Sequence, residues 1–558
     1  MRRVYISVVM MLFASILPIS NLKAQNLDFG GTVLNNDIVT WMDLYDLSFT
    51  SNSFGTARSM AMGNAFTALG ADMVSASLNP AGVGMYVVGD TSFTPMISVA
   101  KSNTSGDSFY LPWAEQTFDN RATNFAIPNM GVVVPVSMSA GLFTNINFAT
   151  SYNRIADFNQ TRLMASRGHN KNNSLANYLC LFGDAASGKL YYNESGVLDY
   201  GDPYYWGVVL ADQCGLMQRD DAGWHNDKID QDAIVDQYSV LETLGAVDEW
   251  SFSGGFNLVD KVYLGIAIGL QSLDYTRNIY CGEDYRYENG VSGLDNPLIY
   301  TNYMQSTHYF GTGYNFKFGV TARPVHWLRI GVAYHTPTYY NLEIYYAGEM
   351  WTETANHAAA NNGRETPNSY AITPNLEEYG IDSWEYRTPS RLLMGVAATI
   401  GKRAIISVDY ERGWYQGIRL QRATIQDAEQ LYNSSIEECF KGNGTLRLGV
   451  EWYMLPMLAL RAGYTWSDSA IKDIYQDAMT SRPLPTKQTF ISAGFGWHLN
   501  KTTYLDFAYQ YGTTHYTAIQ PFYVTEIVDG YATPLIESAI FDTKTSRHNF
   551  VMTLGFRF

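Results

Sequence analysis

The feature that most constrains this chain is a strict alternation of apolar residues with small or polar ones. It is clearest at the end, HNFVMTLGFRF, where every second residue is apolar. The apolar positions there are Phe550, Met552, Leu554, Phe556 and Phe558. A two-residue period is that of a β-strand, because successive side chains point to opposite faces. This strand therefore has one face apolar enough for lipid.

Fourteen segments with this pattern follow from about residue 90. They are 90–101, 124–137, 141–157, 249–258, 261–279, 307–322, 326–345, 390–400, 403–418, 443–453, 457–469, 487–498, 502–516 and 545–558. The first three are the least regular, since Pro95 and Pro135 lie in or beside them. A bacterial single-chain barrel requires an even number of strands. Counts of twelve or sixteen are also compatible with the pattern.

The connections between these strands alternate between short and long. Short turns are expected near 138–141, 259–261, 323–326, 401–403, 455–457 and 499–501, and long loops at 159–248, 282–306, 349–389 and 518–543. Aromatic residues gather at both strand ends, as at Trp327 and Trp497 beside short turns and at Trp414 and Trp466 toward long loops. A soluble β-sandwich also alternates but has no reason for this asymmetry. The pattern predicts an all-β fold, a transmembrane antiparallel β-barrel of about 14 strands in the outer membrane.

The first ninety or so residues do not alternate. Residues 1–24 combine a basic start, a short apolar run and small residues before Gln25, which is typical of a secretory signal peptide cleaved after Ala24. Residues 55–72 are predicted to form a short helix ending at Gly70. Because side chains alone cannot fill a fourteen-stranded barrel, we expect residues 25–89 to form a small, partly helical plug in the lumen. Residues 90–558 would then form the barrel with its long extracellular loops.

Composition excludes several function classes. The formal charge of -16 argues against a nucleic-acid partner. No enzyme motif such as GxSxG, HExxH or a P-loop is present, so neither catalytic residues nor a cofactor are predicted. The acidic run 226–237 lacks the Gly and distal Glu of a calcium loop, which favours a solvated loop.

The cysteines do not indicate a metal site either. The four are Cys180, Cys214, Cys281 and Cys439. They have no CxxC spacing and no nearby His at zinc-ligand spacing. Their pairing cannot be deduced from sequence, so disulfides formed after export and free buried thiols both remain compatible with the pattern.

Alternation places several charged residues inside the barrel. They are Arg329, Arg447, Arg461 and Arg557, with Asp409, Glu411, Glu451 and Asp506. One interpretation is an ion-pair lattice that braces the lower barrel and the plug. The other is that Arg329, Arg447 and Arg461 hold the carboxylate of a ligand, because an Arg fork matches a carboxylate bidentately.

The long loops are unusually apolar for exposed segments. Aromatic and aliphatic residues are dense in 174–186, 202–217, 336–351 and 432–440. These residues either pack the loops against one another or offer a landing site for a poorly soluble ligand.

A motif stands just before the first strand. The stretch 72–84, DMVSASLNPAGVG, has the chemistry of a loop. Within GTARSMAMGNAFTALGADMVSASLNPAGVGMY it resembles the N-terminal hatch of the FadL-type long-chain fatty-acid transporters of the outer membrane, where a Gly/Ala-rich stretch with an Arg precedes an acidic residue and Asn-Pro-Ala-Gly. The matching positions are Gly55, Ala57, Arg58, Gly63, Asp72, Asn79, Pro80, Ala81 and Gly82.

The resemblance implies a fourteen-stranded barrel whose N-terminal hatch plugs the lumen. It implies that a hydrophobic molecule is captured at the outer loops, bound in the lumen, and released sideways through a wall gap near a break in the third strand after the hatch moves. Arg58, Asn79, Pro80, Ala81 and Gly82 would then lie on the substrate path. Fatty acids, aromatic hydrocarbons and hemin are the ligands that the resemblance implies.

The sequence therefore predicts an uptake channel for hydrophobic compounds, with long-chain fatty acids as the first expectation. Its partners would be these small molecules, the outer-membrane lipid and the outer-membrane assembly machinery. Two alternatives stay open. One is a surface receptor or adhesin that binds hemin or a host ligand without transport, and the other is a barrel-embedded lipid hydrolase.

Overall fold

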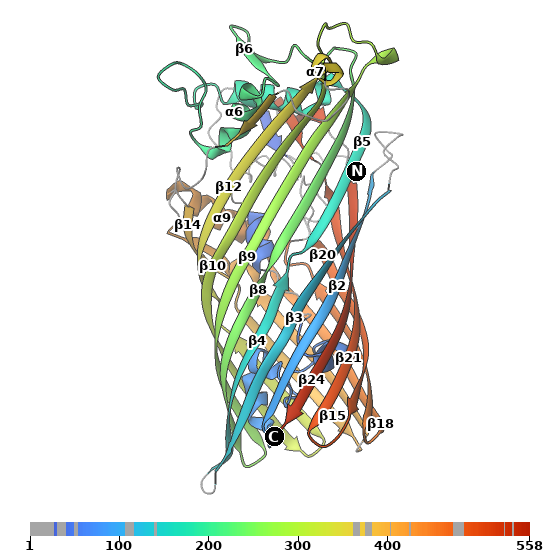
Figure 1. Cartoon of the computed structure of the whole chain (residues 1–558). Coiled ribbons are helices and arrows are strands. Elements are labelled where there is room, and N and C mark those ends of the chain that lie inside the picture. The colour runs from blue at the N-terminus through green and yellow to red at the C-terminus, as the bar shows by residue number, and fades with distance from the viewer. Residues whose placement is uncertain are drawn as a thin grey trace.

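The fold is a tall closed barrel with helices inside it and above it (Figure 1). The computed structural model describes residues 27–30, 41–48, 54–106, 117–138, 142–360, 369–373, 382–401, 403–422, 426–472, 485–519, 521–528, 531–537 and 541–558. The predicted signal peptide lies outside these residues. No helix among them is both long and apolar enough to cross a bilayer.

In the described part of the chain, fourteen antiparallel strands close the wall, which confirms the predicted fold class. They are β2 (Asp90–Gly106), β3 (Thr117–Ser137), β4 (Phe143–Asp157), β8 (Ile234–Leu258), β9 (Val262–Arg286), β10 (Leu298–Val325), β11 (Leu328–His335), β15 (Arg391–Ile400), β16 (Ala404–Trp414), β18 (Gly442–Leu455), β19 (Leu458–Asp468), β20 (Pro485–His498), β21 (Thr503–Ile519) and β24 (Phe541–Arg557). Each pairs with its neighbours in sequence order, and β24 pairs with β2 to close the ring.

The alternation has the predicted sense, with apolar residues outside and polar ones inside. On β24, Phe550 and Phe556 are exposed, whereas Asn549 and Thr553 are fully buried. On β9 the exposed apolar face ends at Leu270 and is followed by Ser272 and Asp274. Because β9 continues to Arg286, its upper part projects beyond the lipid band.

Shorter strands extend the wall on this projecting side. They are β5 (Gln160–Asn170), β12 (Tyr339–Thr354), β13 (Ser369–Ile372), β14 (Asp382–Arg387) and β17 (Arg419–Gln421). β5 pairs with the upper part of β8, and β12 pairs with the upper part of β10. Much of what the sequence analysis treated as long loops is therefore strand.

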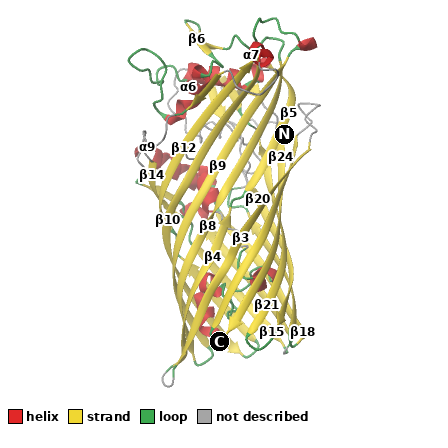
Figure 2. Ribbon diagram, viewed as in Figure 1, coloured by secondary structure: helices red, strands yellow, loops and turns green. Residues whose placement is uncertain are grey.

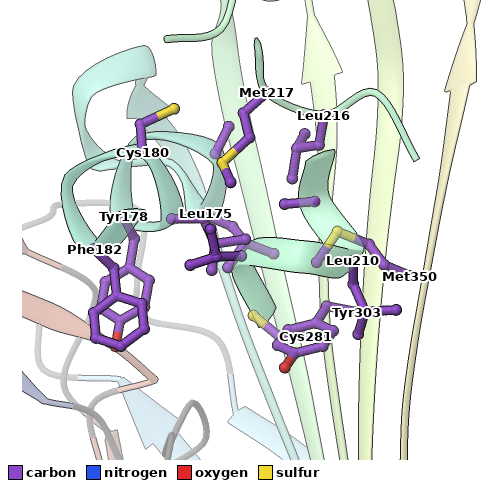
Figure 3. Packing of buried hydrophobic residues seen from close by; sticks show 14 of the residues in the cluster. Leu175, Tyr178, Cys180, Phe182, Leu210, Leu216, Met217, Cys281, Tyr303 and Met350 are labelled. Atoms are coloured by element: carbon purple, nitrogen blue, oxygen red, sulfur yellow. The ribbon is translucent and has the colours of Figure 1, made fainter. Parts of the chain in front are cut away.

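A helical cap covers the projecting end. It contains η2 (Lys171–Asn173), α5 (Leu175–Ala185), η3 (Pro203–Tyr205) and α6 (Trp206–Gln213), with the hairpin β6 (Gln218–Asp220) and β7 (Gly223–His225). Figure 3 shows Tyr178 and Phe182 of α5 on one side of its core, and Leu210 of α6 beside Cys281 and Tyr303 of the wall. The apolar residues of this loop pack together, which is one of the two roles left open by the sequence.

Four further helices lie in connections between the upper strands. They are η4 (Glu288–Gly290), α7 (Ala355–Ala360), η5 (Tyr415–Gly417) and α9 (Gln426–Cys439).

All four cysteines are buried and free in this structure. Burial raises the pKa of Cys180 to about 12, and that of Cys214 likewise to about 12.

The described residues before β2 lie at three levels of the molecule (Figures 1 and 2). β1 (Leu27–Gly30) joins β22 (Tyr523–Val528) and β23 (Tyr531–Glu537) in a small sheet beside the cap. α2 (Trp41–Ser48) is the blue helix at mid-height in Figure 1. The lowest level holds α3 (Ala57–Ala61), α4 (Ser75–Leu78) and η1 (Pro80–Met85). We call residues 54–89 the hatch.

The helices of the hatch differ from the prediction in two places. The helix expected over 55–72 ends at Ala61, because Gly63 and Asn64 adopt positive φ angles of 61° and 55° that break it. Conversely, the stretch 72–84, expected as a loop, contains α4 and η1. The Asn79 side chain caps η1 and Pro80 starts it, which explains the turn.

Candidate functional site

The hatch rests directly on glycines of the wall. An added Cβ at Gly265, Gly319 or Gly331 would come within 3 Å of Pro80, Asn79 or Thr67, respectively. The same holds for Gly255 against Gly84, and for Gly463 against Gly63. These glycines belong to β8, β9, β10, β11 and β19, so the backbone of the hatch touches the wall around much of its circumference.

Side chains of the wall also donate to hatch carbonyls. Arg329 Nη1 reaches Leu69 O at 2.5 Å, His335 Nε2 lies 2.8 Å from Leu78 O, and Ser251 Oγ lies 2.9 Å from Ala76 O. Further donors are Asn147 to Val83, Thr465 to Gly63 and Ser492 to Ala61. At about 1 kcal/mol for each bond, expelling the whole hatch would be costly, so a local shift is the easier movement.

The Asn-Pro-Ala-Gly turn is anchored by its first residue. Asn79 Nδ2 donates to Thr67 O at 2.5 Å and to Thr321 Oγ1 of β10 at 3.2 Å. Its Oδ1 accepts from Ala81 N at 3.1 Å. Asn79, Pro80, Ala81 and Gly82 are all buried. One side chain therefore joins η1, the preceding hatch loop and the wall.

Arg58 connects the hatch to the wall by charge. Its guanidinium donates through Nε and Nη2 to both oxygens of Glu451, each at 2.9 Å, and its Nη1 lies 4.0 Å from Asp72. Glu451 also accepts from Arg461 at 2.7 Å, and Arg461 donates to Asp506 at 2.7 Å. Burial raises the pKa of Asp72, and Arg58 opposes that shift. The result is one buried chain of alternating charges from the hatch to β21.

The three arginines proposed for the lumen do different things. Arg329 holds the hatch carbonyl of Leu69, and Arg461 is held between Glu451 and Asp506. Arg447 is only 1 % exposed and donates to Glu411 at 2.6 Å, while its Nε and Nη1 have no hydrogen-bond partner. Of these three, Arg447 thus keeps two donors for another acceptor. Arg557 is partly exposed and lies 3.6 Å from Asp90.

Sequence reasoning did not single out several inward charges. Lys317 pairs with Glu249 across β10 and β8, and Arg277 of β9 pairs with Asp43 of α2. The alternation of β9 and β10 is a signal that could have placed Lys317 and Arg277 on the inner face. Asp43 gave no signal, because nothing local shows that a short helix before the hatch enters the barrel.

A second apolar region fills the lumen above the hatch. It is formed by buried residues of the upper wall, including Phe158, Val247, Leu273, Tyr275, Tyr309, Tyr340, Leu342, Ile344, Trp384 and Tyr386. Leu44 and Leu47 of α2 pack among them. We call this the outer cluster. It begins just above the level of Leu270, where the lipid-facing surface ends, so the lumen is apolar where the outside becomes polar.

The wall has a seam beside its third strand. In the described part, β3 pairs with β4 only from Asn129 onward, and residues 117–126 pair with β2 alone. β4 ends at Asp157 and resumes as β5 at Gln160, which runs past β2 and β3 without pairing to either. Between them Phe158 turns inward against Tyr275, with ring centroids 4.9 Å apart.

Polar side chains bridge this seam instead of a ladder. Asn124 Nδ2 of β3 donates to Asp157 Oδ2 at 3.0 Å, and Arg547 Nη1 of β24 lies 3.1 Å from Asp157 Oδ1. Side-chain bridges are easier to open than a continuous backbone ladder, because far fewer bonds must break.

A closed lipid-facing barrel with a hatch in its lumen and an apolar region above it defines a class of protein, the plugged outer-membrane transport barrel. The chain belongs to one family of this class, described as outer membrane protein transport protein (OMPP1/FadL/TodX), whose model matches residues 196–558. It is therefore an outer-membrane transport protein, and this family consists of channels, not of enzymes.

Solved structures resemble the chain over most of its length. A FadL homologue from Pseudomonas aeruginosa shares 11% identity, with 94% of this chain and 99% of that one covered and a TM-score of 0.46. The toluene transporter TodX of Pseudomonas putida shares 11% identity, with 90% and 98% covered and a TM-score of 0.47. No curated protein is significantly similar in sequence.

Among the described residues, no group of three His, Cys, Asp or Glu side chains is placed to hold a metal ion. Asp230 of the acidic run accepts instead from Ser292 Oγ at 2.9 Å and from the backbone N–H of Gly293.

Proposed function

We propose that the protein takes up hydrophobic compounds across the outer membrane, with long-chain fatty acids as its substrates. The observation that carries this proposal is the outer cluster, a region of buried aromatic and aliphatic side chains in the lumen above the level where the lipid-facing surface ends. A channel for small hydrated solutes would need polar walls at this level. An apolar lining with a few polar groups is typical of sites for hydrophobic small molecules.

The proposed route has three stages. A ligand is captured at the apolar cap, passes into the outer cluster, and then meets the hatch, which blocks the axis. The tight seating of the hatch on wall glycines and donors favours a small local shift over its expulsion. The seam between β3 and β4–β5 has no continuous backbone ladder, so a sideways exit there would break few backbone bonds.

The seam also has a suitable outer surface. Phe125 of β3 lies on its edge and is 64% exposed on the lipid-facing side. A ligand that leaves there enters an apolar environment without crossing periplasmic water. We propose that Arg58, Asn79, Pro80, Ala81 and Gly82 control this step by holding the hatch in its closed position.

Uptake of labelled oleate by cells with and without the protein tests the proposal. We expect faster, saturable uptake with the protein present. Equal uptake in both strains, with the barrel folded and present at the surface, would overturn it. Competition by unlabelled toluene in the same assay distinguishes a fatty-acid channel from one for aromatic hydrocarbons, since TodX is described as a toluene transporter.

A further inference from the structure

α2 lies inside the lumen, between the hatch below and the cap above (Figures 1 and 2). Its residues Leu44 and Leu47 are 1% and 2% exposed and belong to the outer cluster. A spacing of three places both leucines on one helix face. A short segment of the protein's own chain thus fills the apolar lumen with aliphatic side chains.

The residue before these leucines brings a buried carboxylate with it. Arg277 Nη1 of β9 pairs with Asp43 Oδ1, and Tyr309 of β10 donates from its hydroxyl to Asp43 Oδ2 at 3.0 Å. The side chains of Asp43 and Arg277 are 3% and 11% exposed, and Tyr309 is fully buried. Both oxygens of one carboxylate are therefore held by two adjacent wall strands.

This arrangement has the chemistry of a bound fatty acid: one carboxylate held by an Arg and a Tyr, next to aliphatic groups in an apolar surround. The Arg277 side is not saturated, because its buried Nε has no hydrogen-bond partner. A free carboxylate is not tied to a helix backbone. It can approach the guanidinium fork so that Nε and one Nη donate together, which is the strongest geometry for this pair.

The position of Arg277 suits a first binding site. It lies seven residues beyond Leu270, the last exposed apolar residue of β9, or about 23 Å along the strand. It therefore stands outside the lipid band, between the cap and the polar layer with Lys317 and Arg447. A ligand entering from the cap would meet Arg277 before Lys317 or Arg447.

We propose that α2 is a displaceable internal occupant of the outer cluster, and that Arg277 and Tyr309 bind the carboxylate of a long-chain monocarboxylate that takes its place. This inference rests on the proposed function and names the residues that bind its ligand. α2 has 8 residues, and a helix of this length is marginal in water. The helix has little stability of its own, so its contacts with the wall are what hold α2 in place. A ligand that replaces those contacts can therefore displace it.

Binding of labelled oleate and of oleyl alcohol to the purified full-length protein in a neutral detergent tests the carboxylate site. We expect the wild type to prefer oleate by about tenfold, the size of a charge-assisted hydrogen-bonded pair. Arg277→Gln should abolish the preference and leave binding of the alcohol intact. Tyr309→Phe, which keeps the ring, should reduce it. Arg286→Gln is the matched control, because Arg286 lies on the same strand in an exposed pair with Asp236.

The occupant role has a separate readout. Asp43→Asn weakens the hold of the wall on α2, so its affinity for oleate should rise several-fold. Hydrogen exchange of residues 41–48 in the wild type should accelerate when oleate is added. Slower exchange there, an oleate preference that survives Arg277→Gln, or an unchanged affinity of Asp43→Asn would each overturn the proposal. Heat-modifiable migration shows that each variant is folded.

The uptake function and the carboxylate site with its displaceable α2 would be contradicted by different results. If cells take up oleate and oleyl alcohol equally well and the variants do not differ, this inference fails and the uptake function stands. If cells with wild-type protein take up neither compound, the uptake function fails. Displacement of α2 by oleate in the purified protein would then support a binding site alone.

Discussion

Gly319 of β10 faces Asn79 at one of the points where the hatch packs closely against the wall. A methyl group there would overlap Asn79 Oδ1 and reach Ala81 N at 3.0 Å. Overpacking of this kind costs about 1–3 kcal/mol. We expect Gly319→Ala to lower the temperature of barrel unfolding and to raise the entry of large hydrophilic antibiotics, since a displaced hatch no longer seals the lumen.

Gly254 supplies the matched control for that experiment. It lies next to Gly255 on β8, but its added Cβ would meet only the Phe256 ring, at 4.0 Å. Gly254→Ala should leave both antibiotic entry and thermal unfolding unchanged. Equal behaviour of the two variants would show that the close seating of the hatch is not what seals the barrel.

Asn79 acts at the same scale but through hydrogen bonds. Asn79→Ala removes the cap of η1 and the ties to Thr67 and Thr321, which should cost about 1–2 kcal/mol locally. We expect a barrel that still assembles and a several-fold lower rate of oleate uptake, because the turn no longer keeps its shape. Pro80→Ala should act in the same direction. Full uptake in both variants would mean that this stretch is only a connector.

Among the elements, β4 and β5 form one interrupted strand, and the interruption lies beside the unpaired part of β3. If the seam is the exit, joining its edges should stop release. Asn124→Cys combined with Asp157→Cys places two thiols where the native side chains are 3.0 Å apart. We expect a short, reducible bifunctional thiol reagent to block oleate uptake, and a reductant to restore it.

A second thiol pair controls for the reagent. Val134 and Phe148 are directly opposite on β3 and β4, below the seam, and both are exposed. Bridging cysteines there joins strands that are already paired, so uptake should not change. Unimpaired uptake after bridging the 124–157 pair would place the exit elsewhere. The native cysteines are buried and should not react in the folded protein.

The strands were predictable and their upper ends were not, for a physical reason. In the lipid band a strand separates lipid from lumen, so its residues alternate and β24 was found to within a few residues. Above that band the outside of β9 carries Ser272 and Asp274, so the contrast between an apolar outer face and a polar inner face disappears. Because that contrast was the signal for a strand, the sequence placed the start of β8 near 249, whereas it begins at Ile234. The alternation of apolar and polar residues along a wall strand therefore appears only where lipid covers its outer face.

The site was predictable only where chemistry is local. The Asn-Pro-Ala-Gly turn is defined by adjacent residues, and strand parity put Arg329, Arg447 and Arg461 inside the wall. The contact of Asp43 with Arg277 joins positions 234 residues apart. No local rule predicts such a contact. The number of free donors on each arginine likewise depends on partners from other strands.

At the scale of the whole molecule, the protein stacks three layers along one axis: cap, outer cluster and hatch. The cap is the layer that an external ligand meets first, and it can be removed cleanly. Asn170 of β5 pairs with Ile234 of β8 at the end of their ladder, so a two-residue Asn-Gly turn can replace residues 171–233 and close the hairpin. The barrel below keeps every wall pairing and should assemble.

If the cap captures ligand, this replacement should raise the oleate concentration that gives half-maximal uptake several-fold and change the maximal rate little. The outer cluster and the hatch would still be present, and only the first encounter would be weakened. Replacing the exposed turn 193–197 by glycines controls for disturbance of the loop, since these residues lie outside the core of the cap. Unchanged half-saturation without the cap would mean that ligands enter the lumen directly and that the cap has another task.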